Sequence, residues 1–325
     1  MGLMSTPLPK RHIVPAAIQT VLDSVVVGCC GLAAAGIAGA WSQGLDQVNN
    51  LAPQWTMLGL AAGIGSIAMS PRRRPRIAAT ALLALVGAYL VVPDHVAALT
   101  APTASGPTAL RVVSFNAWKS NPQYERAGRW LIGERPDVIV LTEATPRLRE
   151  MLEREYPYAV SCLPGGACST VIYSRTRPID GGGLAKGGDP EARTALSAAW
   201  AVIPAVGGPV TVLALHLNHP WPLGDGADQM KEISAFLEGR SKTRMIVAGD
   251  LNRTPWSHAL AVVDRTLGMT RATHALATWP VGGSIPTLFP IDHVYSGDGL
   301  VVGRIGTGPF LGSDHLPVVA TVANR

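Results

Sequence analysis

Charged side chains are scarce in this chain. They make up 15% of its 325 residues, whereas ordinary soluble domains carry about a quarter. The shortage is local, because residues 1–105 hold six Lys or Arg and three Asp or Glu while residues 106–325 hold 21 and 19. The distribution argues against a single soluble domain and predicts an apolar N-terminal region followed by one sizeable soluble domain.

The chain also lacks a strong excess of charge of one sign, and it lacks a cysteine cluster that could bind a metal. Residues 106–325 have a net charge of only +2, which argues against a dedicated surface for polyanions. The chain has four cysteines and no His-x-x-x-His pattern, so the sequence offers no structural zinc site. No internal repeat of solenoid length is present.

Three uncharged stretches fill the N-terminal region. The first lies between Asp23 and Asp46, the second between Asp46 and Arg72, and the third follows Arg76. Roughly 20 apolar residues are enough for a helix to cross the hydrocarbon of a bilayer. We therefore expect an all-α membrane region over residues 1–99, with two spans and a buried helix as the alternative to three spans. The three expected transmembrane helices are at about 18–40, 52–70 and 77–97.

Cations in the short loops predict the orientation of these spans. Lys10 and Arg11 precede the first span, and an arginine run at 72–76 separates the second span from the third. Basic short loops stay in the cytoplasm, so three crossings place the rest of the chain outside it. We expect a multi-pass cell-membrane protein with the lipid bilayer as a partner, a Pro, Thr and Ser linker at 100–108, and an extracytoplasmic domain at 109–325.

Two of the cysteines bracket a short turn in the outer domain. Cys162 and Cys168 flank Leu-Pro-Gly-Gly-Ala, and an oxidising exterior would allow them to form a disulfide. Closing so short a loop would stabilise the fold by about 2 kcal/mol. Two free thiols are the alternative.

Beyond the linker, short apolar runs alternate with amphipathic segments. This alternation is typical of an α/β domain with enough strands for two sheets. Helices are expected at 121–135, 146–155, 225–237 and 256–263. Strands are expected at 110–115, 137–142, 169–173, 196–203, 210–217, 244–248, 291–295 and 317–322.

Polar residues stand where these expected strands end. An α/β scaffold holds catalytic groups rigidly at such positions. One strand-terminal carboxylate is commonly a turn or cap residue, but six such positions in order indicate a functional site. In chain order they read Ser-Phe-Asn116, Leu-Thr-Glu143, Leu-His216-Leu-Asn, Gly-Asp250-Leu-Asn252, Ile-Asp292-His293-Val and Ser-Asp314-His315-Leu-Pro.

This ordered set resembles the endonuclease/exonuclease/phosphatase superfamily, which includes deoxyribonucleases, apurinic-site endonucleases, inositol polyphosphate phosphatases and bacterial sphingomyelinases. The resemblance covers about residues 109–323 and none of the membrane region. It implies an α/β (α+β) four-layer sandwich, in which two β-sheets pack face to face with helices outside.

The chemistry of these side chains suits the hydrolysis of phosphate esters. Glu143 and Asp314, assisted by Asn116, are hard oxygen ligands for Mg²⁺ or Mn²⁺. His315 is placed to accept a proton from water, with Asp292 fixing its tautomer. These roles match those of the family.

The remaining site residues complete the expected reaction. Asp250 and Asn252 would orient water and donate a hydrogen bond to a phosphoryl oxygen, while His216 would contact phosphate or protonate the leaving group. Arg193 is a possible phosphate contact or a surface salt-bridge residue. Asp180 and Glu191 are nominal carboxylate partners for His216. His219, Trp221, His258 and His274 are interpreted as loop and packing residues.

The sequence therefore predicts a membrane-anchored, metal-dependent phosphoesterase. A lipid or small-molecule phosphoester is favoured, because the linker holds the domain close to the bilayer. An extracytoplasmic nuclease acting on DNA or RNA is the alternative, although its groove would be expected to contain more basic and aromatic residues. A non-catalytic anchor or assembly module is the hypothesis from another class.

Overall fold

A computed structural model describes residues 13–69, 73–101, 104, 106–163, 168–184, 196–219 and 226–325. The chain divides into two compact units, Met1–Pro93 and Asp94–Arg325. The division falls inside a helix, six residues before the helix ends and ahead of the expected linker.

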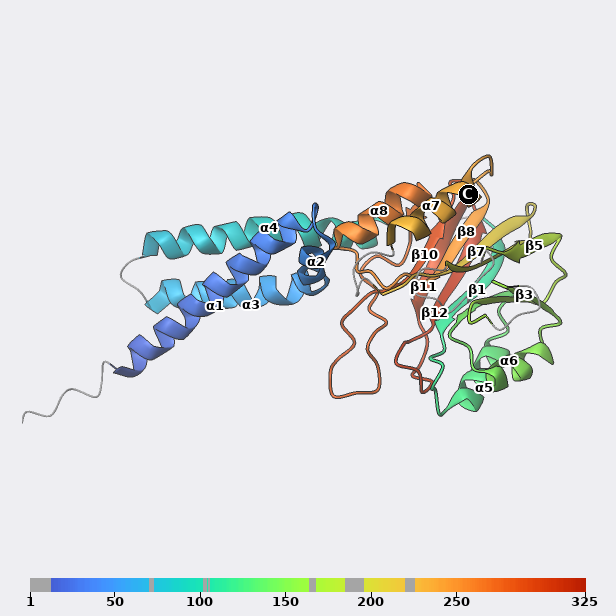
Figure 1. Ribbon diagram of the computed structural model, residues 1–325, viewed down its shortest axis with the longest axis horizontal. Helices are drawn as coiled ribbons and strands as arrows, with labels where there is room; N and C mark the ends of the chain where they lie inside the picture. The colour runs from blue at the N-terminus through green and yellow to red at the C-terminus, as the bar shows by residue number, and fades with distance from the viewer. Residues whose placement is uncertain are drawn as a thin grey trace, which may run out of the picture. The chain divides into compact units, whose positions relative to one another are not determined.

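The first unit is helical (Figure 1). Its long helices are α1 (Ile13–Ala38), α3 (Ala52–Met69) and the part of α4 (Arg73–Leu99) up to Pro93. The short helix α2 (Gln43–Asp46) and the 3₁₀ helix η2 (Gln47–Leu51) connect α1 to α3. Two of the helices, at Ala16–Ala38 and Arg74–Leu99, are long and apolar enough to cross a membrane. This length and composition also occur in signal sequences and in buried core helices.

Small residues and one ion pair hold these helices together. A Cβ atom at Gly59 of α3 would lie 2.8 Å from atoms of both Cys29 and Leu83, so glycine allows close packing there. Asp23 of α1 forms an ion pair with Arg76 of α4 at 2.6 Å and accepts a hydrogen bond from Ser66 of α3 at 2.5 Å. The side chains of Asp23, Ser66 and Arg76 are therefore turned toward one another.

The second unit contains two mixed six-stranded sheets. The first sheet has the order β11-β12-β1-β2-β4-β3 and the second has the order β5-β6-β7-β8-β10-β9. The strands of the first sheet are β1 (Thr108–Asn116), β2 (Val138–Thr142), β3 (Tyr158–Ser161), β4 (Val171–Ser174), β11 (Leu300–Thr307) and β12 (Val318–Asn324). Those of the second sheet are β5 (Asp180–Gly183), β6 (Ser197–Ile203), β7 (Val210–His216), β8 (Met245–Asp250), β9 (Thr270–Arg271) and β10 (Asp292–Ser296).

Buried apolar clusters arrange this unit in layers. One cluster lies between the sheets and includes Val112, Val140, Ala214 and Ile246. A second cluster packs α5 (Tyr124–Glu134) and α6 (Pro146–Glu153) against the outer face of the first sheet. A third packs α7 (Gly226–Leu237) and α8 (His258–Leu267) against the outer face of the second sheet (Figure 1). The expected sandwich of helices, sheet, sheet and helices is present.

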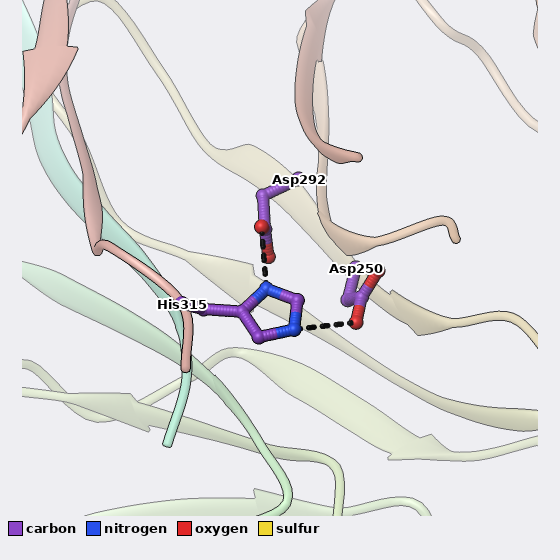
Figure 2. Close-up of side chains that lie close together, drawn as sticks. All are labelled: Asp250, Asp292 and His315. Atoms are coloured by element: carbon purple, nitrogen blue, oxygen red, sulfur yellow. Dashed lines mark hydrogen bonds and ion pairs between the residues drawn. The ribbon is translucent and has the colours of Figure 1, made fainter. Parts of the chain in front are cut away.

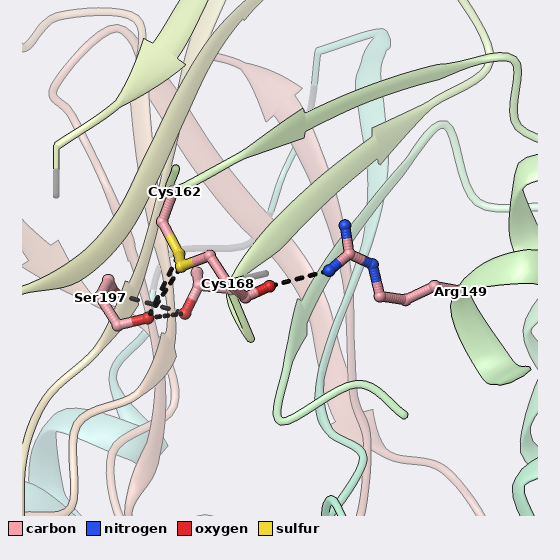
Figure 3. Close-up of a disulfide and its surroundings, with 5 residues drawn as sticks. Arg149, Cys162, Cys168 and Ser197 are labelled. Atoms are coloured by element: carbon pink, nitrogen blue, oxygen red, sulfur yellow. Dashed lines mark hydrogen bonds between the residues drawn. A yellow bond between two sulfur atoms is a disulfide. The ribbon is translucent and has the colours of Figure 1, made fainter. Parts of the chain in front are cut away.

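The cysteine pair of the second unit is bonded. Cys162 and Cys168 form a disulfide with a Cα–Cα distance of 5.8 Å (Figure 3). Both cysteines are buried in the cluster between the sheets. The bonded alternative is therefore the one found.

Candidate functional site

The ends of central strands in both sheets bring five of the expected site residues together. Asn116 ends β1 and Glu143 follows β2 in the first sheet, whereas His216 ends β7 and Asp250 ends β8 in the second. The ladders set Asp250 opposite both His216 and Asp292. Residues that are up to 200 positions apart in the chain consequently share one site.

Asp250 is the centre of this site. Its side chain is almost fully buried, and its Oδ2 accepts a hydrogen bond from Asn116 Nδ2 at 2.9 Å. The same Oδ2 lies 3.9 Å from His216 Nε2 and 3.7 Å from His315 Nε2. Asn116 Nδ2 also donates to Glu143 Oε1 at 3.0 Å, so one amide group links the carboxylates of the two sheets.

His315 lies between two buried carboxylates (Figure 2). Its Nδ1 is 2.7 Å from Asp292 Oδ2, and a carboxylate at that position holds the proton on Nδ1 and leaves Nε2 to act as a base. Burial alone would lower the pKa of His315, but the negative charges of Asp292 and Asp250 outweigh burial and raise this pKa to about 10.

The backbone beside Asp250 requires a glycine. Gly249 has φ of 146°, and a Cβ atom there would overlap the carbonyl oxygen of Leu215 on β7. β8 can therefore lie close to β7 just before Asp250. Asn252 then adopts a left-handed conformation with φ of 52°, and its backbone N–H donates to Asp250 Oδ1 at 2.9 Å.

Left-handed backbone recurs around Glu143. Glu143 has φ of 51° and Trp118, two residues after Asn116, has φ of 54°. Such angles are rare for bulky residues and cluster at functional sites. They turn the Trp118 N–H toward Asn116 Oδ1 at 3.0 Å and the Lys119 N–H toward Glu143 Oε2 at 3.5 Å.

Asp314 is held by a residue that the sequence did not point to. Trp279 Nε1 donates to Asp314 Oδ2 at 3.1 Å, and no pattern links these residues, which are 35 positions apart. The sequence indicated Ser313 only as the first residue of the Ser-Asp-His motif. Its Oγ donates to the carbonyl oxygen of Asn116 at 2.7 Å and accepts from the His315 N–H at 3.1 Å, so it connects the motif to β1.

One suggested carboxylate partner of His216, Asp180, lies elsewhere in the second sheet. Asp180 is opposite Val202 on β6, which is opposite Thr211 on β7, so Asp180 lies at the other end of the sheet from His216. The expectation for Asp180 is therefore wrong, and the carboxylates near His216 Nε2 are Glu143 at 3.7 Å and Asp250 at 3.9 Å. Glu191, Arg193 and Trp221 are outside the described residues.

The chemistry of the site fits a divalent cation. Ligand atoms of Asp250, Asp292 and His315 lie within 4.8 Å of one another, the one group of this kind among the described residues. Asp292 Oδ1 is buried with no hydrogen-bond partner in the described part of the chain. Closely spaced carboxylates in a buried site need positive charge nearby.

The model of the endonuclease/exonuclease/phosphatase family matches residues 113–315. The chain belongs to this family. Family members are metal-dependent phosphoester hydrolases, and the protein is accordingly a hydrolase of phosphate ester bonds. No curated protein sequence matches the chain.

Three solved structures with this fold are distant from this chain in sequence. A Staphylococcus aureus beta toxin mutant with bound magnesium ions is 20% identical with a TM-score of 0.52, covering 66% of this chain and 99% of that one. A Bacteroides thetaiotaomicron family protein is 16% identical with a TM-score of 0.56, covering 67% and 99%. SmcL is 17% identical with a TM-score of 0.52, covering 67% and 99%. At these identities the likeness concerns the fold alone.

Proposed function

We propose that this protein is a membrane-anchored phosphoesterase that uses Mg²⁺ or Mn²⁺ and whose catalytic unit faces out of the cytoplasm. The proposed substrate is a phosphoester of a lipid or small molecule. The observation that carries the catalytic part is the position of His315 between Asp292 and Asp250, next to Asn116 and Glu143.

His315 is the proposed general base. Asp292 keeps the proton on Nδ1, so Nε2 accepts the proton of the attacking water. The high pKa of His315 has the neighbouring carboxylates as its cause. Positive charge bound among those carboxylates would therefore favour the neutral imidazole that the reaction needs.

His216 and Asn252 are proposed to act on the substrate. His216 Nε2 faces the carboxylates of both sheets, where it can donate a hydrogen bond to a phosphoryl oxygen or protonate the leaving alkoxide. Asn252, whose Nδ2 also donates to the Leu217 carbonyl oxygen at 2.8 Å, is proposed to donate a hydrogen bond to a phosphoryl oxygen. Asp250 is proposed to orient the attacking water.

Asn116, Glu143 and Asp314 are proposed to hold the metal, with Asp250 next to Asn116. Asp292 and His315, the other two members of the compact group around Asp250, are proposed to act in proton transfer and not as metal ligands. The bound cation would offset charge on the non-bridging oxygens and on the leaving group. Oxygen ligands suit Mg²⁺ and Mn²⁺, and the related beta toxin structure contains magnesium ions.

The exposed surface of the helical unit supports a membrane anchor. Large apolar side chains point outward on each long helix, among them Val27 at 70% exposure, Ile64 at 65% and Leu85 at 69%. Such a surface is unfavourable in water and favourable in lipid. We propose three spans, α1, α3 and α4, with the basic residues at 10–11 and 72–76 on the cytoplasmic side. The disulfide supports an oxidising compartment for the catalytic unit.

A substrate at the membrane surface is favoured over nucleic acid. The chain between Leu99 and the first residue of β1 is short, which confines the site near the proposed bilayer surface. The net charge of +2 over residues 106–325 gives little attraction for a polyanion.

Hydrolysis by the purified full chain tests this function. With Mg²⁺, we expect turnover of bis(4-nitrophenyl) phosphate or of phospholipid vesicles that stops with EDTA and returns with metal. Efficient cleavage of short DNA with no lipid activity would favour the nuclease. Metal binding without turnover of any diester or monoester would favour the non-catalytic module.

A further inference from the structure

The two halves of the site belong to different sheets. Asn116 and Glu143 extend from the first sheet, whereas His216 and Asp250 extend from the second. The separation of the sheets at this end therefore decides whether His216 and Glu143 face each other at the observed 3.7 Å.

A buried group connects the sheets at the same end. Thr170, just before β4, and Ser197, the first residue of β6, have their hydroxyl oxygens 2.7 Å apart. The Thr170 hydroxyl also lies within hydrogen-bond distance of the Ser197 carbonyl oxygen, at 3.3 Å. Ser197 Oγ is 3.4 Å from Cys162 Sγ and 3.7 Å from Cys168 Sγ. We call Thr170, Ser197 and the disulfide the inter-sheet clamp.

Figure 3 shows the Ser197 hydroxyl facing the disulfide, with Arg149 of α6 on the other side. Arg149 Nη1 donates to the Cys168 carbonyl oxygen at 3.0 Å. A disulfide sulfur carries no proton, so the Ser197 hydroxyl is the donor in its contacts with sulfur. On one side, α6 and the first sheet hold the clamp through Arg149 and Thr170. On the other side, the second sheet holds it through Ser197.

The clamp lies beside strands that carry site residues. Ser197 is opposite His216 in the β6–β7 ladder, and opposed residues have side chains in contact range on the same face of a sheet. Val171, next to Thr170, is opposite Leu141 on β2, two residues before Glu143. The clamp therefore connects Ser197, the ladder partner of His216, to β4, which pairs with the strand that precedes Glu143.

We propose that the inter-sheet clamp positions His216 against Glu143, so that metal binding and turnover depend on the disulfide. The inference rests on the proposed catalytic function of the site. The clamp residues are positioning residues, because they act through His216 and Glu143 and not on the substrate.

The chemistry of reduction explains this dependence. A dithiol transfers two electrons and two protons, breaks the Cys162–Cys168 bond, leaves two thiols and becomes a cyclic disulfide. The two sulfurs, bonded at about 2 Å in a disulfide, then separate to a non-bonded distance. Both cysteines are buried between the sheets, where close packing leaves no spare room. Reduction therefore changes the packing between the sheets beside Ser197.

Ser197→Ala tests the clamp without touching the disulfide. Ser174→Ala is the matched control, because Ser174 is a buried serine at the opposite end of β4 whose Oγ donates to the Thr176 carbonyl oxygen at 2.6 Å. Mg²⁺ affinity is measured by calorimetry on the full chain, together with kcat and KM. We expect Ser197→Ala to weaken Mg²⁺ binding and to lower kcat about tenfold with little change in KM, while Ser174→Ala leaves all three unchanged. Equal Mg²⁺ affinity and kcat in the two variants would overturn the proposal.

Dithiothreitol provides the second test. Reduction of the wild type should lower Mg²⁺ affinity and kcat together, and reoxidation should restore both. Alkylation of the thiols followed by mass spectrometry confirms that the disulfide is reduced. Cys162→Ser with Cys168→Ser should match the reduced protein and not respond to dithiothreitol. Unchanged Mg²⁺ affinity in the fully reduced, folded wild type would contradict the proposal. If the wild type hydrolyses no phosphoester, the proposed function fails, whereas the Mg²⁺ titration still tests the clamp.

Discussion

At the residue scale, each charged group of the site has a fixed neighbour. Asp292 is bound to His315, Asp314 to Trp279, and Glu143 to Asn116. A hydrogen bond to a charged group contributes about 1.5–3 kcal/mol when its partner is buried. Single substitutions of the neighbours therefore separate the roles of the carboxylates.

Trp279→Phe removes the hydrogen bond to Asp314 and keeps an aromatic ring against Phe289, whose ring centroid is 5.5 Å away. Because Asp314 loses its fixed orientation, we expect Mg²⁺ affinity to fall roughly tenfold, measured by calorimetry. Trp200→Phe is the control, since Trp200 lies under Arg240 and outside the site. Equal Mg²⁺ affinity in both variants would contradict a role for Trp279.

The burial of His293 leads to a prediction of how the free energy of unfolding depends on pH. Its Nε2 is 2.8 Å from the Arg253 carbonyl oxygen and its Nδ1 is 3.0 Å from Thr273 Oγ1, which satisfies a neutral ring. Complete burial lowers the pKa of His293 from 6.5 to about 4, so the folded state binds fewer protons than the unfolded state between these values. The free energy of unfolding should therefore fall by about 2 kcal/mol from pH 7 to pH 5.

Chemical denaturation at several pH values checks this expectation. His293→Gln, which keeps a donor and an acceptor but does not titrate, should lose about 2 kcal/mol less over the same range. Parallel pH profiles for the two proteins would show that His293 does not carry this dependence.

At the element scale, the central strands were predictable and the edge strands were not. All eight expected strands match strands of the structure, because each is a run of buried apolar residues such as Val138–Thr142. The missed strands β3, β5, β9 and β11 are the four sheet edges. An edge strand is half exposed and needs no apolar run, and β5 reads Asp-Gly-Gly-Gly, a composition depleted in strands.

The site was predictable to the extent that its residues end strands. Asn116, Glu143, His216 and Asp250 could be assigned because they end central strands or follow them directly. Asp292 begins β10, which runs antiparallel to β8 and so reaches the same edge. Trp279 could not, since its contact with Asp314 depends on the path of a long loop. The inter-sheet contact between Thr170 and Ser197 likewise depends on tertiary packing.

The last turns of α4 belong to the catalytic unit, and this yields a prediction on stability. Asp94 lies 2.8 Å from Arg271 Nη1, and the two side chains are 7% and 12% exposed. Asp94→Asn leaves the buried Arg271 guanidinium with Asp264 as its one carboxylate partner among the described residues, so we expect a loss of about 3 kcal/mol in the free energy of unfolding.

Asp228→Asn is the control for Asp94, because Asp228 is exposed and pairs with Lys231 at the surface. We expect a change below about 0.5 kcal/mol for this variant. Denaturation of the full chain in detergent measures both values. A loss for Asp94→Asn no larger than that of the control would show that the ion pair does not stabilise the unit.

At the whole-molecule scale, the proposed anchor should matter for some substrates only. The chain from Leu99 to Thr108 extends to at most about 30 Å, so the proposed anchor would confine the site near a bilayer and raise the effective concentration of a lipid substrate. A chain beginning at Asp94 keeps the contact with Arg271 and lacks the first unit. We expect it to lose roughly 100-fold on phospholipid vesicles and little on a soluble diester. Equal losses on vesicles and on short DNA, with DNA cut efficiently, would favour the nuclease.

Asp292 and His315 are proposed to form the base of a metal-dependent phosphoesterase, and Asp292→Asn is the sharpest test of this role. Asparagine keeps the shape of the side chain but can no longer hold the reactive tautomer of His315, so turnover should fall by about 10³ to 10⁴ while Mg²⁺ affinity persists. Glu143→Gln should weaken both, because Glu143 is a proposed ligand. The decisive measurement is a Mg²⁺ titration of phosphodiester hydrolysis for the wild type and both variants. Retained turnover in Asp292→Asn at saturating Mg²⁺ would contradict the account.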